Sequence, residues 1–269
     1  LVTRTNSLTG RRIIDDPTIM SWQLANEPRP GGSPAVAARQ LPAYMAWINA
    51  TARLIKSLDP NHLVSTGSEG TQGCISEEHC VIDAHSSPDI DYVTAHIWPQ
   101  NWGWADPKDL AGTWPTVEAN TRDYIAKQVA IATRLNKPLV IEEFGFPRDG
   151  GSFDPSATVD FRNRFYGLIY SAALESQRSG GPIAGTNFWS WNGEGRAHHP
   201  DHKFQRGDTR YLGDPPHEPQ GWYGVFDTDL STHAVIRALL AQLRPPARAA
   251  GGQGDAATGR FAQRASPDK

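Results

Sequence analysis

Two short segments of the sequence each place a glutamate where it can do acid–base or nucleophilic chemistry. Asn26-Glu27-Pro28 follows the apolar residues 19–25, and Glu143-Phe144-Gly145 follows the apolar residues 139–142. Two carboxyl groups about 5–5.5 Å apart, one protonated and one ionised, can cleave a glycosidic bond with retention of configuration. Either tripeptide alone is a weak signal. Because each ends an expected strand, the two together predict a carboxyl pair of this kind.

Tryptophan is concentrated in two stretches of the chain. Trp98, Trp102 and Trp104 lie in the first, and Trp189 and Trp191 lie in the second. Sugar rings present apolar C–H faces that stack on indoles, so clusters of exposed tryptophans are typical of a carbohydrate cleft. On this pattern alone, packing in the core explains the clusters equally well.

Alternating strands and helices must position these residues. Apolar runs predict strands at 19–25, 62–66, 91–96, 139–142 and 183–191, and helical spacing predicts helices at 41–58, 117–135, 158–177 and 232–243. This alternation is typical of a parallel sheet built of βα units. The glycine-rich phosphate turn of a doubly wound nucleotide fold does not follow the first expected strand. A barrel, whose strands deliver their last residues to one common face, is therefore favoured.

Charge and composition limit the classes of partner. A net charge of −3 and a pI near 6.3 give no reason to expect nucleic acid or an anionic membrane as partner. Cys74 and Cys80 lie close together in an expected loop, and the sequence leaves open whether they form a disulfide or remain free thiols. His79 and His85 complete no recognisable ligand pattern there, so no metal site is expected. The Ala-, Gly-, Arg- and Pro-rich residues 245–269 are expected to be disordered.

Several segments resemble one known family in the same order along the chain. Residues 16–29, which end in LANEPR, resemble the fourth strand of glycoside hydrolase family 5, in its β-mannanase branch. The segments HIWP (96–99), IEEFG (141–145) and NFWSW (187–191) resemble the sixth, seventh and eighth strands, and residues 220–227 also look similar to the family. The resemblance covers nearly everything from Thr3 to about Leu243.

The resemblance implies an α/β fold, a (β/α)8 TIM-barrel glycosidase. In this family about three strands precede the Asn-Glu-Pro strand, and residues 1–18 leave little room for them. We therefore expect an N-terminally truncated barrel in which residues 1–244 form only about strands 4–8 with their helices. Such a partial barrel has two open sheet edges, so we expect it to be poorly stable or prone to aggregation unless a partner supplies the rest.

The resemblance also assigns roles to residues. Glu27 would be the general acid/base and Glu143 the nucleophile. Because consecutive strand residues point to opposite faces, only one of Glu142 and Glu143 is expected to face the cleft. Asn26 would hydrogen-bond to the sugar 2-hydroxyl, and His96 would hydrogen-bond near the nucleophile or the substrate.

Three further substrate-binding residues follow from the same comparison. Arg29 would contact the sugars on the leaving side, and Trp189 would form the floor under the reactive sugar. Trp98 stands where many family members have tyrosine, and its indole N–H can donate a hydrogen bond but cannot accept one. For Asn26, Arg29 and His96 a purely structural role, as a turn, surface or core residue, remains the alternative.

The activity implied by the resemblance is that of an endo-β-1,4-mannanase. It would cleave mannan, glucomannan or galactomannan, or manno-oligosaccharides, by double displacement without a metal or organic cofactor. An exo-β-mannosidase, a β-1,4-glucanase and a catalytically inert carbohydrate-binding fragment remain alternatives. A polymeric substrate implies a secreted or periplasmic protein. The sequence does not determine its oligomeric state.

Overall fold

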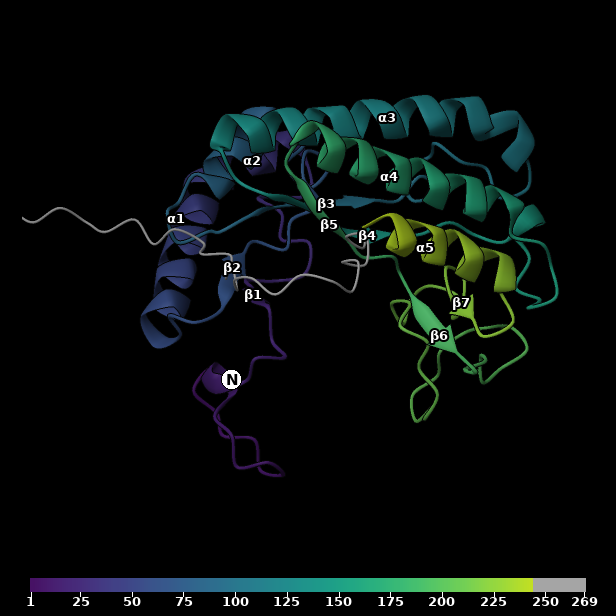
Figure 1. The fold of residues 1–269 in the computed structure, drawn as a ribbon, viewed down its shortest axis with the longest axis horizontal. Coiled ribbons are helices and arrows are strands. Elements are labelled where there is room, and N and C mark those ends of the chain that lie inside the picture. The colour runs from purple at the N-terminus through teal and green to yellow at the C-terminus, as the bar shows by residue number, and fades with distance from the viewer. Residues whose placement is uncertain (244–269) are drawn as a thin grey trace, which may run out of the picture.

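The computed structural model describes residues 1–243 and consists of strands that alternate with helices (Figure 1). In chain order the larger elements are β1 (Ser21–Gln23), α1 (Pro34–Leu58), β2 (Leu63–Ser65), α2 (Glu78–His85), β3 (Val93–Ile97), α3 (Leu110–Leu135), β4 (Leu139–Phe144), α4 (Asp160–Ser179), β5 (Ile183–Thr186), β6 (Trp191–Gly193), β7 (Val225–Phe226) and α5 (Leu230–Leu243). Single 3-10 turns lie at Ile13–Asp15 and Asp149–Gly151. The tail that is expected to be disordered, residues 245–269, lies outside the described residues.

All the strand ladders are parallel, as the βα rhythm predicts. β1 pairs with β2, β3 pairs with β4, β4 pairs with β5, and β6 pairs with β7. The backbone N–H of Asp91 donates to the carbonyl of Val64 at 2.8 Å, which holds β2 beside the start of β3. Within residues 1–243 the ladders form three short sheets, β1–β2, β3–β4–β5 and β6–β7. The strands β1 and β5, which were expected to be open edges, each have a partner on one side only, and so do β2, β3, β6 and β7.

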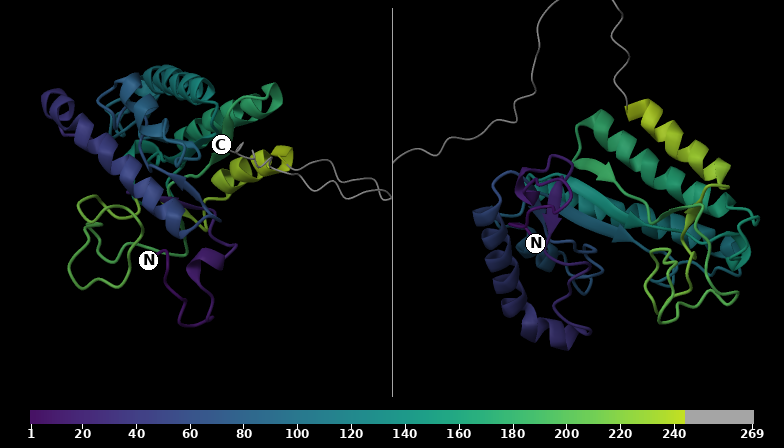
Figure 2. Two further views of the ribbon diagram at one scale, coloured as in Figure 1. Left: turned by 90° about the vertical axis from the view of Figure 1, so that its left-hand side faces the viewer. Right: turned by 90° about the horizontal axis from the view of Figure 1, so that it is seen from below.

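Helices cover one side of this sheet, and long loops lie on the other. α3 and α4 lie over β3, β4 and β5, with α5 beside α4, and α1 lies beside β1 and β2 (Figure 1). The N-terminal segment and the loop 194–224 lie on the side of the sheet away from α3, as the view from below shows (Figure 2). None of the helices that the structure describes is both long and apolar enough to cross a bilayer.

The buried side chains form two clusters. The larger one, called here the large core cluster, joins β3, β4 and β5 to α3 and α4; it includes Val93, Ile141, Phe144, Phe165 and Tyr166. The other, called the small core cluster, joins α1 and α2 to β2; it includes Tyr44, Ile48, Val64, Val81 and Ala84. Cys74 and Cys80 form a disulfide inside the small core cluster, which settles the alternative that the sequence left open.

Several elements differ from the sequence-based expectation, among them α3, which begins at Leu110 rather than at residue 117, and the short strand β7, which was not expected. α1 begins at Pro34 rather than at residue 41, because Ser33 caps the helix by accepting the Val36 N–H and Pro34 occupies its first turn. α2 was not expected, since a helix this short carries little periodic signal. The expected strand 183–191 is divided into β5 and β6, although Asn187 and Trp189 still donate backbone hydrogen bonds to carbonyls of β4.

Candidate active site

Glu27 reaches the carboxyl edge of the sheet through a sharp turn of the backbone. Its φ of 47° is left-handed, which few residues other than glycine adopt, and its N–H donates to the Gly67 carbonyl at 2.9 Å. Gly67 itself has a φ of 74°, and a Cβ there would collide with the carbonyl oxygen of Ala25. The close approach of these two turns therefore fixes where the Glu27 side chain begins.

A β-bulge in β4 sets the direction of the neighbouring glutamates. Ala95 pairs with Ile141 but His96 pairs with Glu143, so Glu142 is the extra residue. Both carboxylates consequently turn toward His96, and the expectation that they point to opposite faces is wrong. Only Glu143 lines the cleft, however, because Glu142 is buried and accepts a hydrogen bond from Gln23.

His96 is the centre of the carboxylate cluster. Its Nδ1 lies 2.9 Å from Glu27 Oε1 and 3.3 Å from Glu143 Oε2, and its Nε2 lies 3.7 Å from Glu142 Oε2. One carboxylate oxygen of Glu27, one of Glu143 and a ring nitrogen of His96 all lie within 4.8 Å of one another. This spacing fits the separation of about 5–5.5 Å that retaining glycosidases need, and is too short for the water that inverting enzymes place between the two groups.

The environment raises the pKa values of Glu143 and His96. Burial raises the pKa of Glu143 to about 7, aided by the charges of Glu27 and Glu142 and opposed by His96 and by the indole of Trp98. Burial alone would lower the pKa of His96, but hydrogen bonds to Glu142 and Glu27 and the charge of Glu143 raise it to about 9. His96 is therefore a cation at neutral pH and favours the ionised form of Glu143.

The geometry of Glu27, His96 and Glu143 also satisfies the distance requirement for a metal site. A metal ligand must present an unprotonated nitrogen, whereas the raised pKa of His96 keeps its ring protonated at neutral pH. The three side chains form an ion-pair cluster whose charges already balance in part.

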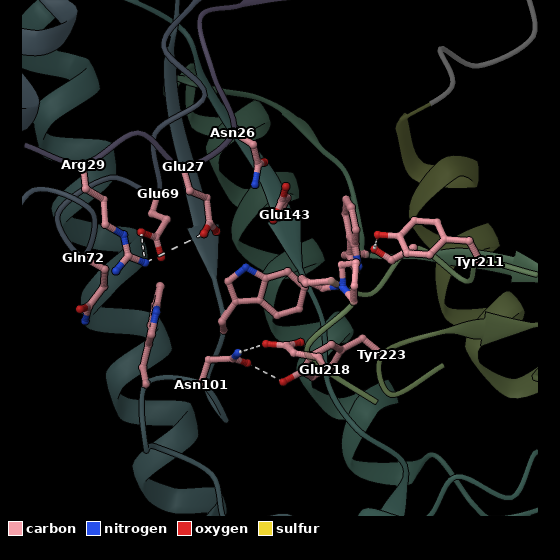
Figure 3. Close-up of a pocket in the computed structure, with 16 residues that line it drawn as sticks. Asn26, Glu27, Arg29, Glu69, Gln72, Asn101, Glu143, Tyr211, Glu218 and Tyr223 are labelled. Atoms are coloured by element: carbon pink, nitrogen blue, oxygen red, sulfur yellow. Dashed lines mark hydrogen bonds and ion pairs between the residues drawn. The ribbon is translucent and has the colours of Figure 1, made fainter. Parts of the chain in front are cut away.

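A cleft of about 470 Å³ opens above the carboxylates (Figure 3). Among the residues named from the sequence, the ones that line it are Asn26, Glu27, Arg29, Trp98, Trp102, Glu143 and Trp189. His96 lies beneath them and is 1% exposed, so it contacts the carboxylates and not the cleft. Of the two roles expected for His96, the one near the nucleophile matches its position.

Glu69, which sequence reasoning missed, forms the wall on the side of Arg29. Arg29 Nη2 lies 2.6 Å from Glu69 Oε2 and 4.0 Å from Glu27 Oε2, so the guanidinium links the two carboxylates (Figure 3). Burial and the charge of Glu27 raise the pKa of Glu69, while Arg29 opposes the shift. A signal for Glu69 was present, because it follows the expected strand 62–66 just as Glu27 and Glu143 follow theirs.

The opposite wall comes from the loop 194–224, and sequence reasoning assigned no role to the residues of this loop that line the cleft. Tyr211, Gly213, Pro215, Pro216, Glu218 and Tyr223 line the cleft there. Asn101 ties this loop to the end of β3, since it donates to Glu218 Oε1 at 3.2 Å and accepts a hydrogen bond from the Tyr223 hydroxyl. Figure 3 shows these three side chains joined on the side of the cleft away from Arg29.

The aromatic floor of the cleft is packed closely. The rings of Trp98 and Tyr223 lie 4.8 Å apart between centroids. A Cβ on Gly145 would lie 2.6 Å from Trp98 Cζ3 and 2.9 Å from the carbonyl oxygen of Trp189, so the residue at 145 must lack a side chain. Trp98 lines the cleft but is only 9% exposed.

Comparison with known proteins decides the family. The family model described as GH family 5 beta-mannosidase-like matches residues 1–247. The chain belongs to glycoside hydrolase family 5. This agrees with the resemblance found in the sequence, and the expectation of a (β/α)8 barrel fold, of which the described residues form a part, is confirmed.

Relatives of this family 5 chain carry consistent names. Mannan endo-1,4-beta-mannosidase 1 of Arabidopsis thaliana is 33% identical over 208 residues, which are 70% of this chain and 46% of the relative. Mannan endo-1,4-beta-mannosidase 4 of Oryza sativa subsp. japonica is 33% identical over 204 residues, covering 70% of this chain and 41% of the relative. This family 5 chain thus spans about half the length of the curated relatives it matches.

Solved structures of family 5 enzymes superpose on the same region. The family 5 mannosidase from Rhizomucor miehei matches with a TM-score of 0.76 at 33% identity, covering 90% of this chain and 55% of that one. A mutant of that mannosidase was solved in complex with mannosyl-fructose. The endo-beta-1,4-mannanase from Thermotoga petrophila, at 24% identity and a TM-score of 0.59, covers 90% of this chain and 47% of that one and supports the fold alone.

Proposed function

We propose that the protein is a retaining β-mannan hydrolase in which Glu27 is the general acid/base and Glu143 is the nucleophile. The observation that carries this proposal is the carboxyl pair at the base of the cleft, whose oxygens and His96 lie within 4.8 Å of one another. Family membership gives the same reaction class.

The reaction proceeds in two displacements at one carbon. In the first, a Glu143 oxygen attacks the anomeric carbon while Glu27 donates its proton to the leaving glycosidic oxygen, so the bond between sugars breaks as the glycosyl–enzyme bond forms. In the second, Glu27 takes a proton from water, whose oxygen attacks the same carbon and releases Glu143. Protonated His96 stabilises the ionised Glu143 before attack and after release.

The substrate class we propose is β-1,4-linked mannan, glucomannan or galactomannan, cleaved within the chain. The names of the plant relatives support this choice. The cleft supports it too, since Trp189 offers an apolar face for a sugar ring while Asn26 and Arg29 offer hydrogen-bond donors beside the carboxylates. No cofactor enters the proposal, because two carboxyl groups suffice for the chemistry.

Polymer hydrolysis by the purified 269-residue protein tests the substrate and the nucleophile together. Reducing ends released from galactomannan, glucomannan and cellulose would be measured for the wild type, for Glu143→Ala and for Glu175→Ala, a matched control on the exposed face of α4. We expect release from both mannans, retained in Glu175→Ala and abolished in Glu143→Ala. Faster cleavage of cellulose would contradict the substrate assignment.

The mode of action and the two catalytic roles need separate measurements. A fall in galactomannan viscosity that runs ahead of reducing-end release indicates cleavage within the chain, whereas an exo-mannosidase releases mannose at nearly constant viscosity. With an activated aryl β-mannoside, azide should rescue Glu143→Ala and give the α-mannosyl azide, because azide then attacks opposite the leaving group. Azide should rescue Glu27→Ala with net retention, through the glycosyl–enzyme. If Glu27→Ala gave the α-mannosyl azide and Glu143→Ala gave the product with retention, Glu27 would be the nucleophile and Glu143 the general acid/base.

We also propose that the protein acts outside the cytoplasm. The buried disulfide between Cys74 and Cys80 supports this, because such bonds persist in oxidising compartments. A polymeric substrate also requires an exported enzyme. Fractionation of the source cells, followed by detection with an antibody, tests the proposal, and recovery in the cytoplasm with both thiols free would contradict it.

A further inference from the structure

A second cluster of ligating side chains lies on the loop 194–224, outside the cleft. His198 Nδ1, His199 Nε2 and a carboxylate oxygen of Asp208 all lie within 4.8 Å of one another. His199 Nε2 is 2.9 Å from Asp208 Oδ1 and 3.1 Å from Oδ2, and His198 Nδ1 is 3.8 Å from Oδ1. Two imidazole nitrogens thus face one carboxylate.

The loop holds the carboxylate of Asp208 in place. Its Oδ2 accepts the backbone N–H of Gln205 at 2.8 Å, and its own N–H donates to the Gln205 carbonyl at 3.0 Å. Gly207, with a φ of 102°, supplies the backbone conformation that this tight turn requires. The Asp208 side chain is only 8% exposed and therefore has little freedom to leave this position.

The two histidines are arranged to present one nitrogen each. Their rings stack with centroids 4.7 Å apart and planes 27° apart. Both rings also line a cavity of about 430 Å³, together with Phe153 and Arg196, through which an ion can reach them. Arg196 does not compete for the carboxylate of Asp208, since its guanidinium pairs with Asp227 at 2.8 Å and donates to two backbone carbonyls.

We propose that His198, His199 and Asp208 bind one divalent transition-metal ion of the zinc class, with water completing the coordination. Imidazole and carboxylate are the ligands that such ions take, at about 2.0–2.2 Å. Tetrahedral bonds of this length place ligand atoms roughly 3.3 Å apart. The separations of the two histidine nitrogens from Asp208 Oδ1, 2.9 Å for His199 and 3.8 Å for His198, lie on either side of that value. The two histidines have ligating nitrogens within 4.8 Å of each other.

The sequence did not predict this site. The absence of a metal was expected from the residues around Cys74 and from the needs of the catalytic chemistry. Two adjacent histidines followed by Asp208 match no standard ligand spacing, and only the folded loop brings the three together. The ligands lie far from Glu27 and Glu143 in the chain, and the ion has no part in the hydrolysis proposed above.

The position of the site indicates what the ion does. Asp208 is followed by Tyr211 and Glu218, which form the cleft wall. An ion bound by residues 198, 199 and 208 closes this part of the loop on itself and reduces the freedom of the segment that follows. The ion would therefore stabilise the cleft wall as a structural clamp.

Zinc binding to the purified full chain tests the proposal. Titration calorimetry with ZnCl2 alone would be run on the wild type, on His199→Ala, on the isosteric Asp208→Asn, and on His217→Ala, a matched control because His217 is an exposed histidine of the same loop. We expect one ion per chain in the wild type and in His217→Ala. The affinity of His199→Ala and of Asp208→Asn should fall at least 10-fold.

Two more measurements separate a clamp from simple surface binding. Cobalt(II) should give the visible spectrum of a four-coordinate site in the wild type and lose it in Asp208→Asn. Amide hydrogen exchange in residues 196–224 should slow on addition of zinc in the wild type and in His217→Ala only. Equal zinc affinity in all four proteins would overturn the site, and tight binding without slower exchange would overturn the clamp.

Discussion

The two core clusters differ in how they are stabilised. The large core cluster is built mainly from long helices and the longest strand. Near the start of α5 lies an ion-pair network of Arg148, Arg162 and Asp229. The small core cluster has fewer large side chains and contains the disulfide between Cys74 and Cys80. Small cores bury too little apolar surface to stabilise themselves well, and a cross-link offsets part of that deficit.

The candidate active site lies where these two regions meet. Glu27 follows β1, which pairs with β2 of the small core cluster, while Glu143 belongs to β4 in the large one. His96, at the end of β3, contacts both carboxylates. The distance between Glu27 and Glu143 therefore depends on how two separately stabilised regions are held together. The following variants test each region and then the contact between them.

The largest effect is expected from Asp229→Ala in the region of the large core cluster. Arg148 Nη2 lies 2.7 Å from Asp229 Oδ1, and both Arg148 and Arg162 are almost fully buried. Removal of the carboxylate leaves two buried cations with backbone carbonyls but without their anionic partner. This should cost about 3–5 kcal/mol in the free energy of unfolding, measured with urea. The control Asp227→Ala breaks the exposed pair with Arg196 and should cost less than about 1 kcal/mol. Equal losses in the free energy of unfolding for Asp229→Ala and Asp227→Ala would show that burial of the ion pair does not determine its contribution.

Next in size is the effect of His96→Ala, which removes the contact between the two regions. We expect kcat/KM on galactomannan to fall about 100-fold, because an oriented charge beside the reacting groups is lost. His96 lowers the pKa of Glu143, which is about 7 with the histidine present. Without it that pKa rises further, so the acidic limb of the pH profile of kcat/KM should move to higher pH.

A matched control for His96→Ala is His62→Ala. His62 is also buried and paired with a carboxylate, that of Asp59 at 2.7 Å, but it lies at the opposite end of β2 from the cleft. This variant should lose stability and keep the pH profile of the wild type. If the two profiles shifted together, the effect of His96 would be structural only.

A smaller effect is expected from the double variant Cys74→Ser with Cys80→Ser. The disulfide closes a short loop, so its loss should lower the free energy of unfolding by roughly 2 kcal/mol. Hydrogen exchange should quicken in α1 and α2 and stay unchanged in α4. Equal changes in all three helices would indicate that the two clusters unfold as a single unit.

The smallest effects are expected from two variants that each remove one methyl group from one core cluster. Ile48 of the small core cluster and Ile141 of the large one are each 1% exposed. Ile48→Val and Ile141→Val should each lower the free energy of unfolding by about 0.5–1.5 kcal/mol. If a thermal scan shows two transitions and each variant shifts a different one, the two core clusters unfold separately. A single transition shifted by both variants would show that they unfold together.

Much of the active site could be predicted because it follows from local pattern. Glu27 and Glu143 come directly after apolar runs, and parallel strands deliver such residues to one edge. The direction of Glu142 could not be predicted, because the bulge arises from the pairing of β4 with β3 and not from the sequence of β4 itself. An alternation rule applied to one strand fails wherever its partner shifts the register.

The cleft wall opposite Arg29 was beyond prediction for a different reason. Glu218 is held by Asn101, which is more than a hundred residues away in the chain. The loop 194–224, which carries Glu218 and precedes β7, has no hydrophobic periodicity. Glu69 could have been found by the same strand-end rule that located Glu27. The start of α1 was predicted several residues too far along the chain, because its capping residue Ser33 precedes the apolar residues with helical spacing.

Gly145 has a consequence for the range of sugars that the cleft can accept. A Cβ at residue 145 would lie 2.6 Å from the Trp98 ring, 2.9 Å from the Trp189 carbonyl oxygen and 3.1 Å from Tyr223 Cβ, and these atoms belong to three different segments. A methyl group at this position would force these segments apart, so the dimensions of the cleft are defined to the tolerance of a single carbon atom. Variants intended to widen the cleft should therefore leave residue 145 unchanged and alter the loop that carries Tyr211, whose side chain is exposed to solvent.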